Sequence, residues 1–185
     1  GAHMLDGTGA CRVVGIPASI DNDVGHTSLA IGTDTAVNTI VEACDRISDT
    51  ARAHCRAFII EVMGRHCGFL AMRAGIAAEA NAILFAEKNL GDEQLVSKLK
   101  TALRSCFAET RVNKRALIVK AEGVRMSTPE LVTRLEEAMR VDVPGIEVRG
   151  VVLGHVVRGG SPSALDRLVA QDRKSTRLNS SHEDL

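Results

Sequence analysis

AFIIEVMGR, residues 57–65, is a short aliphatic run that ends in glycine and arginine. Uninterrupted apolar runs of this length are typical of strands buried on both faces of a sheet. The run Ala57–Val62 therefore predicts one strand of a buried sheet. Four further runs of this kind predict its neighbours: Arg12–Ile16, Asn81–Phe85, Arg115–Lys120 and Glu147–Val152.

Helical patterns separate the predicted strands. Apolar residues recur every three or four positions over 37–47, with Thr33 or Asp34 as the expected N-cap. Further helices are expected within 67–80, over 92–103, from Thr128-Pro129-Glu130 and from Ser161-Pro162. Thr128 is the expected cap of the third of these, with Pro129 at its first helical position. Strands that alternate with helices imply βαβ units. The sequence therefore predicts an α/β fold, a three-layer sandwich with a mostly parallel central sheet.

The composition excludes several classes of partner. Net charge is +0 and 25% of residues are charged, so neither nucleic acid nor an acidic membrane is indicated. The five cysteines are odd in number and form no CxxC pair, which is typical of free thiols in a reducing compartment. No apolar run approaches the ~20 residues of a membrane span. We expect a cytoplasmic protein.

Both ends of the chain differ from the rest. Residues 1–4, GAHM, have the form of a cloning scar. Residues 172–182, DRKSTRLNSSH, match the in-frame translation of a common DNA sequencing adapter. We therefore interpret 172–185 as a non-native polar tail. We expect the natural sequence to continue differently after Gln171.

Two carboxylates follow the first predicted strand. PASIDND, residues 17–23, places Asp21 and Asp23 on either side of Asn22. A carboxylate can accept the proton of an attacking hydroxyl. A second carboxylate can raise the pKa of the first or hold the water of a metal ion. The alternative is an Asx-rich turn without a chemical role.

Glycine, arginine and histidine follow other predicted strands. Gly64-Arg65 follows 57–62, where glycine would allow close backbone approach and arginine would bind phosphate. The alternative is an ordinary strand-to-helix turn with an exposed arginine. LGHVVRGGSP, residues 153–162, combines His155 and Arg158 with three glycines and a helix start, which favours a phosphate cradle. Such strand ends meet at one edge of a parallel sheet. The set suits phosphoryl transfer to a hydroxyl of an anionic small molecule.

Four of these motifs together resemble the 6-phosphofructokinase family. IDND (20–23), EVMGR (61–65), the strand ending in AEG (121–123) and VLGHVVRGGSP (152–162) occur in the family's order and at nearly its spacing. The resemblance runs from about residue 12 to residue 171. It implies a phosphofructokinase-like fold and a glycolytic kinase that phosphorylates the 1-hydroxyl of fructose 6-phosphate, with ATP as co-substrate and Mg²⁺.

The resemblance implies four catalytic residues. Asp21 would be the base that deprotonates the 1-hydroxyl. Asp23 would assist it and contact Mg²⁺ indirectly. Ser19 stands where many bacterial members have threonine, and its hydroxyl would help to hold the transferring phosphoryl group. Arg65 would neutralise charge on that group.

The resemblance also implies the substrate-binding residues. Met63 and Gly64 would contact the sugar, and Glu122 would accept hydrogen bonds from its hydroxyls. His155 and Arg158 would bind the 6-phosphate.

Three further positions bear on partners. Arg56 and Arg149 match family arginines that reach into the sugar-phosphate site of a neighbouring subunit, so the resemblance implies a homo-oligomer, dimer or tetramer, with shared active sites. Ala18 stands where the pyrophosphate-dependent branch typically has lysine, which favours ATP as the donor.

The resemblance divides the chain into unequal parts. Residues 5–34 would be the edge of the ATP-binding domain with the IDND turn, 35–152 the fructose 6-phosphate domain and 153–171 a return segment. The family's Gly-rich ATP segment and its GDGS-like magnesium segment are not seen upstream of IDND. We therefore expect a fragment that is inactive without the missing ATP-binding part and holds no tightly bound cofactor. The alternative is a stand-alone sugar-phosphate binding or regulatory module without catalysis.

Overall fold

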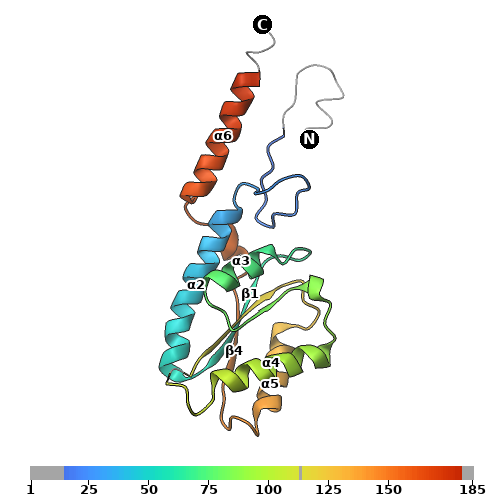
Figure 1. The fold of residues 1–185 in the computed structure, drawn as a ribbon, viewed down its shortest axis with the longest axis vertical. Helices are drawn as coiled ribbons and strands as arrows, with labels where there is room; N and C mark the ends of the chain where they lie inside the picture. Colours follow the sequence, from blue (N-terminus) through green and yellow to red (C-terminus); the bar gives the residue numbers. More distant parts are fainter. Residues whose placement is uncertain (1–14, 113, 181–185) are drawn as a thin grey trace.

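The computed structural model describes residues 15–112 and 114–180 (Figure 1). The scar at 1–4, the stretch 5–14 and the last five residues of the expected tail lie outside the described residues. Most of the first predicted strand, residues 12–14, lies there too.

The described residues contain one four-stranded sheet. Its strands are β1 (Ala57–Val62), β2 (Ala82–Leu84), β3 (Ala116–Ala121) and β4 (Val148–Val152). The order is β2-β3-β1-β4, and every pairing is parallel. The predicted parallel sheet is therefore confirmed, and the run 57–62 is a strand over its whole length.

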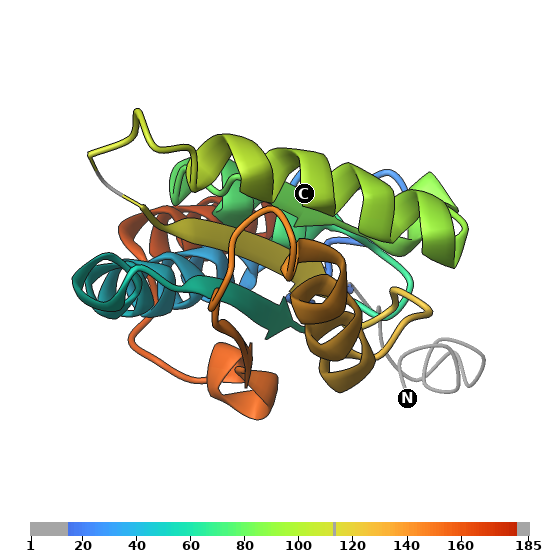
Figure 2. The same ribbon diagram turned by 90° about the horizontal axis from the view of Figure 1, so that it is seen from below.

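Helices cover both faces of this sheet (Figure 2). Successive residues of β1 point to opposite faces, so Ile60 packs in one core and Ile59 in the other. The first face carries α2 (Thr33–His54) and α3 (Phe69–Ala77), and the second carries α4 (Asp92–Cys106) and α5 (Thr128–Met139). The predicted three-layer sandwich is confirmed.

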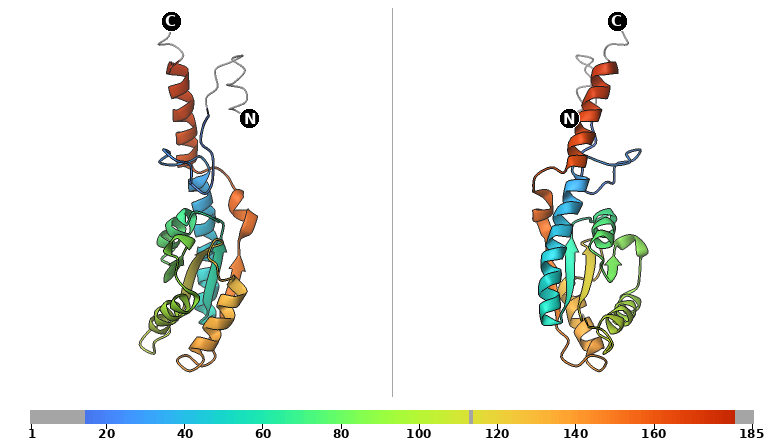
Figure 3. Two further views of the ribbon diagram at one scale, coloured as in Figure 1. Left: turned by 90° about the vertical axis from the view of Figure 1, so that its right-hand side faces the viewer. Right: turned by 60° about the vertical axis from the view of Figure 1, so that its left-hand side comes forward.

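The remaining elements are short or lead out of the layers. A 3-10 turn, η1 (Ala86–Lys88), follows β2, and η2 (Gly154–Arg158) follows β4. Helix α6 (Ala164–Ser180) starts beside the N-terminal end of α2 and projects away from the sheet (Figure 3). It continues through 172–180, the first part of the expected polar tail. None of the described helices is long and apolar enough to cross a membrane.

Three local predictions are wrong. Gly15 and Ile16 are not in a strand; the nearest pairing is a single parallel bridge between Ala18 and Ile31. Helix α2 has Gly32 as its N-cap, with φ 101°, so Thr33 and Asp34 lie inside the helix. Helix α5 is capped one residue earlier than expected.

The cap of α5 is Ser127, whose hydroxyl accepts a hydrogen bond from the Glu130 amide at 3.3 Å. Thr128 and Ser127 are both hydroxyl residues that can cap a helix, so the sequence alone does not separate them. Pro129 still lies in the first turn, as expected.

Candidate active site

The ends of three adjacent strands bring the predicted site residues to one edge of the sheet. Val62 of β1 is in register with Ala121 of β3, and Glu61 with Val152 of β4. The loops after them are joined by backbone hydrogen bonds, from Glu122 to the Val62 carbonyl at 2.8 Å and from Leu153 to the Glu61 carbonyl at 3.0 Å. Met63-Gly64-Arg65, Glu122 and η2 therefore leave the sheet side by side.

Glycines let two of these loops touch through their backbones. A Cβ added at Gly123 would lie 2.0 Å from the Arg65 carbonyl oxygen. Gly64 has φ 120°, and a Cβ there would lie 2.5 Å from the Cys67 carbonyl oxygen. No side chain fits at either position without backbone movement. The position of Arg65 therefore depends directly on the loop that carries Glu122.

Met63 contributes differently from its neighbours. Its side chain is only 8% exposed and packs in the core with α2 and α3. The side chain thus anchors the start of the Arg65 loop, and contact with a sugar, as predicted, would have to come from its backbone.

The PASIDND turn is closed by its own amide. Asn22 has a left-handed backbone with φ 54°, which asparagine tolerates better than most residues. Its Oδ1 accepts a hydrogen bond from the Ala30 amide at 2.8 Å, and its Nδ2 donates to the Ser28 carbonyl at 3.3 Å. Asn22 therefore ties the turn to the segment before α2, a structural role that the carboxylates on either side of it do not share.

Ser19 lies between these two carboxylates. Its hydroxyl oxygen accepts a hydrogen bond from the Asp21 amide at 3.2 Å and donates to Asp23 Oδ1 at 3.5 Å. Asp21 is partly buried, whereas Asp23 is exposed. Three of the four predicted catalytic residues are thus held in one turn.

Electrostatic interactions connect Asp21 to the loops after the strands. Burial is the largest cause that raises the pKa of Asp21, and the charges of Asp23 and Glu122 raise it further. Arg158 and His66 oppose this shift, but the pKa of Asp21 remains above its ordinary value. A higher pKa makes this carboxylate a stronger base. His66 was missed by the sequence analysis although it directly follows Arg65.

A cavity lies beside this cluster. It has a volume of about 390 Å³ and is lined by Ile20 of the PASIDND turn and by Arg158 and Gly159 after β4. Arg158 and His155 both lie on η2, and both side chains are exposed. The cavity connects the predicted catalytic turn with the predicted phosphate cradle.

Asp166, which the sequence analysis missed, joins the start of α6 to the start of α2 beside this cavity. Its carboxylate is 2% exposed and accepts hydrogen bonds from the Gly32 amide at 2.9 Å and the Thr35 amide at 2.8 Å. The Thr35 hydroxyl donates to it as well, at 2.5 Å. Burial raises the pKa of Asp166, but these hydrogen bonds together hold it below the ordinary value. A residue 131 positions away from Thr35 therefore caps helix α2.

A buried ion pair fixes the strands just before the site. Lys120 is 1% exposed, and its ammonium donates to the Glu61 carboxylate at 2.9 Å. The Thr128 hydroxyl donates to the same carboxylate. Burial raises the pKa of Glu61, but the hydrogen bonds from Thr128 and Lys120 lower it below its ordinary value. The pair joins β1, β3 and α5 at the residues that precede the Arg65 and Glu122 loops.

Two predicted residues lie elsewhere. Arg56 precedes β1 and Arg149 lies near the start of β4, at the amino edge of the sheet. Both pair with Glu147, Arg56 through Nε at 2.5 Å and Arg149 at 3.1 Å. The length of β1, about 20 Å at ~3.3 Å per residue, separates them from Gly64.

The described residues contain no group of three or more histidine, cysteine or acidic side chains placed to hold a metal ion. Asp21 and Asp23 lie in one turn, held by the Ser19 hydroxyl. Mg²⁺ usually keeps several waters and takes only one or two protein carboxylates together with substrate phosphates. This donor set fits such an ion.

Comparison with known proteins identifies the family. The phosphofructokinase family model matches residues 1–176, and the chain belongs to this family of α/β enzymes. It is 45% identical over 157 residues to the ATP-dependent 6-phosphofructokinase of Bacillus licheniformis, covering 85% of this chain and 46% of that protein. For the Thermotoga neapolitana protein of the same name, identity is 43% over 170 residues, with 92% and 50% covered. The chain thus spans about half the length of these relatives.

Solved structures give the same result for the fold. Phosphofructokinase from Pichia pastoris in the T-state superposes with a TM-score of 0.77 at 29% identity, covering 89% of this chain and 19% of that one. A pyrophosphate-dependent phosphofructokinase from Marinobacter aquaeolei has a TM-score of 0.73 at 24% identity, with 92% and 44% covered. The second likeness concerns the fold alone. The predicted resemblance and fold class are confirmed.

Proposed function

We propose that this chain is the acceptor side of an ATP-dependent 6-phosphofructokinase, which transfers a phosphoryl group from ATP to the 1-hydroxyl of fructose 6-phosphate. The observation that carries the proposal is the position of Asp21, which interacts with Asp23, Arg158, Glu122 and His66. A base, a phosphate-binding arginine and a hydrogen-bond acceptor for sugar hydroxyls would then act together at one edge of the sheet. The names of the curated relatives support the same activity.

In this proposal Asp21 accepts the proton of the 1-hydroxyl as the oxygen attacks phosphorus. Its raised pKa increases its affinity for that proton. Ser19 holds Asp21 and Asp23 in one turn, and Arg65 offsets negative charge on the transferring group. Mg²⁺, held through Asp23 and water, would screen charge on the same group.

The substrate is held by the loops after β1, β3 and β4. Gly64 and the Met63 backbone would contact the sugar, and the exposed Glu122 would accept hydrogen bonds from the sugar hydroxyls. The side chains of His155 and Arg158 would bind the 6-phosphate, since charged donors in a fork suit phosphate oxygens. Ala18 favours ATP over pyrophosphate as the donor, as the family pattern implies.

The amino-edge arginines support an oligomer with shared sites. Arg56 and Arg149 lie about 20 Å of strand away from Gly64, too far to reach the same ligand within one chain. Both are held on Glu147 at the opposite edge. We infer that they serve the site of a neighbouring copy in a dimer or tetramer.

Donor binding would come from the rest of the enzyme. We infer that 5–34 belongs to the edge of the ATP-binding domain, 35–152 to the fructose 6-phosphate domain and 153–171 to the return segment. Transfer requires donor, metal and acceptor to be aligned. We therefore expect this chain with ATP and Mg²⁺ to form no fructose 1,6-bisphosphate above a protein-free blank.

Calorimetric titration with fructose 6-phosphate tests the proposal. We expect saturable binding by the chain, weakened by ~1.5–3 kcal/mol in Arg158→Ala, the range for a hydrogen bond to a charged group. Arg46→Ala on the exposed face of α2 is the matched control and should bind as the unchanged chain does. Equal binding by Arg158→Ala, or no binding by a folded chain, would contradict the assignment.

A further inference from the structure

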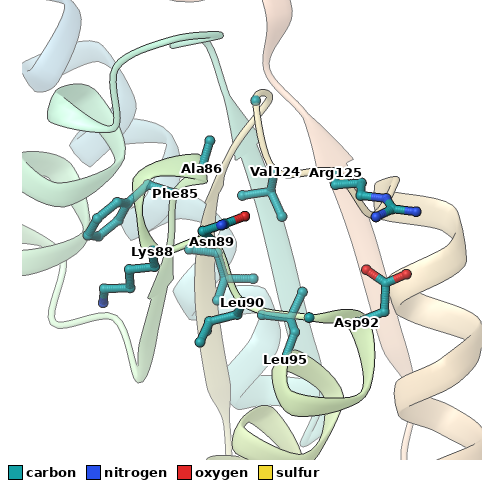
Figure 4. Close-up of a pocket in the computed structure, with 12 residues that line it drawn as sticks. Phe85, Ala86, Lys88, Asn89, Leu90, Asp92, Leu95, Val124 and Arg125 are labelled. Atoms are coloured by element: carbon teal, nitrogen blue, oxygen red, sulfur yellow. The ribbon is translucent and has the colours of Figure 1, made fainter.

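A second cavity lies at the same edge of the sheet, on the far side of the Glu122 loop from the Asp21 turn. This β2–β3 pocket has a volume of about 350 Å³ and lies between the segment after β2, the start of α4 and the loop after β3 (Figure 4). Its volume is at the lower end of the range for small-molecule sites. None of the predicted catalytic or substrate-binding residues lines it.

One part of the pocket is apolar. Leu84 and Leu95 are buried beneath it, and Leu90 and Val124 contribute further aliphatic surface. In Figure 4 the side chains of Leu90, Leu95 and Val124 lie between the segment after β2 and the loop after β3. A ligand with a hydrocarbon group would remove this surface from water, which favours binding.

The other part carries two opposite charges. The Arg125 guanidinium and the Asp92 carboxylate both line the pocket, from the loop after β3 and the first turn of α4, and Figure 4 shows both on the same side of it. Neither has a hydrogen-bond or ion-pair partner among the described residues. The other cation of the lining, Lys88, lies over the ring of Phe85, another lining residue, with its nitrogen 4.5 Å from the ring centre.

We propose that the β2–β3 pocket binds an apolar α-amino acid. The α-carboxylate would pair with Arg125, the α-ammonium with Asp92, and the side chain would pack on Leu95 and Val124. A plain anion would be repelled by Asp92 and a plain cation by Arg125, so the two charges select a zwitterion. Charged hydrogen bonds to both groups then orient the ligand.

Both walls of the pocket are connected to the Arg65 loop. On one wall, Gly123 packs against the Arg65 carbonyl, where even one added carbon would not fit. On the other, Glu87 of η1 accepts a hydrogen bond from the Gly68 amide at 2.6 Å, at the start of α3. An occupant that changes the spacing of the walls therefore shifts the Arg65 loop from two sides.

Binding itself does not depend on the proposed kinase function, whereas an effect on phosphoryl transfer would rest on it. Calorimetric titration with L-phenylalanine and L-leucine tests binding directly. We expect one site per chain for both amino acids. On the unchanged chain, 3-phenylpropionate and 2-phenylethylamine, which each lack one charge, should bind at least about tenfold more weakly than L-phenylalanine.

Two variants locate the site. Asp92→Asn and Arg125→Met should each weaken L-phenylalanine binding about tenfold or more. Glu93→Gln removes the next acid of the same helix turn, outside the pocket, and should bind as the unchanged chain does. Amide NMR signals of Gly68 and Gly123 should shift on addition of L-phenylalanine and should not shift in Arg125→Met.

Three outcomes would overturn the proposal: no binding of either amino acid by the folded chain, equal binding by 3-phenylpropionate, or undiminished binding by both variants. Fructose 6-phosphate is absent from all of these titrations. Failure of the proposed kinase assignment and failure of this inference are therefore seen in different experiments.

Discussion

Asp166 connects helix α6 to the start of α2, and Asp166→Asn tests how strongly. The substitution keeps the shape of the side chain and removes its charge. Asparagine Oδ1 can still accept from the Gly32 amide, as the carboxylate does at 2.9 Å. Its Nδ2, however, would face the amide and hydroxyl of Thr35, which both donate to the carboxylate now.

The expected cost follows from these contacts. A hydrogen bond to a charged group contributes ~1.5–3 kcal/mol, and loss of a helix N-cap costs ~0.5–2 kcal/mol. Because one accepting contact survives, we expect Asp166→Asn to lower the free energy of unfolding by ~2–3 kcal/mol. For a chain of this size, that corresponds to a fall in Tm of about 5–10 °C.

The pH dependence adds a second test. The pKa of Asp166 in the folded chain lies below the ordinary value of 3.8, because hydrogen bonds to the carboxylate outweigh its burial. The stabilisation that the Asp166 carboxylate gives the fold is therefore fully present above pH 3.8. It is lost as the pH falls through the pKa of the folded chain. The difference in Tm between the two proteins should close on acidification.

Thermal unfolding followed by circular dichroism measures both effects. Asp34→Asn is the matched control, because Asp34 carries the same charge in the first turn of α2. Among the described residues its side chain accepts one long hydrogen bond, from Asn38 Nδ2 at 3.4 Å. We expect it to cost ~0.3–1 kcal/mol, as for a charge near a helix N-terminus. Equal losses for the two variants, or a pH-independent loss for Asp166→Asn, would refute the capping role.

Three further predictions concern the site and the core. Burial and a neighbouring carboxylate raise the pKa of Asp21, so the ionised side chain destabilises the fold. Asp21→Asn should therefore raise Tm at pH 7, and this gain should vanish as the pH falls below 3.8; an unchanged Tm at pH 7 would contradict the raised pKa. Gly123→Ala places a Cβ against the Arg65 carbonyl and should lower the free energy of unfolding by ~1–3 kcal/mol in denaturant titrations. Gly91→Ala, where a Cβ would meet no atom within 4 Å, should be close to neutral, and equal effects of the two variants would argue against the close contact. Burial, then a nearby aspartate, raises the pKa of Cys44 to about 11, so iodoacetamide at pH 8 should modify the exposed Cys55 and leave Cys44 intact by peptide mass spectrometry; modification of both at similar rates would contradict this.

The sheet could be predicted from the sequence because its strands are buried on both faces. The run 57–62 is a strand over its full length, and β2, β3 and β4 lie within one residue of the predicted bounds. Continuous aliphatic runs identify such strands without information about their partners. The strand order could not be predicted, because it depends on which strands pair.

Helix starts were less predictable. Gly32 has no side chain to cap α2, and the capping carboxylate comes from Asp166, far along the chain. A local pattern cannot show such a contact. The predicted strand at 12–16 fails over its described part because Ile16 has no neighbouring strand there, and Ala18 forms only one bridge.

The residues of the candidate site could be predicted from the sequence, but the contacts that hold their strands in place could not. Asp21, Arg65, Glu122 and Arg158 all follow predicted strands, and parallel topology brings strand ends to one edge. The buried Lys120 pair that fixes two of these strands was not predicted, since an isolated lysine in a strand gives no sign of its partner.

Amide NMR of the isotope-labelled chain during titration with fructose 6-phosphate tests the central claim most directly. We expect saturable shifts at the carboxyl edge of the sheet, in the signals of Gly64, Gly123 and Gly159. When the chain is diluted until it is a monomer, the signal of Arg56 at the amino edge should stay unchanged. Shifts confined to the amino edge, or no shifts in a folded chain at saturating ligand, would contradict an acceptor site built on the ends of β1, β3 and β4.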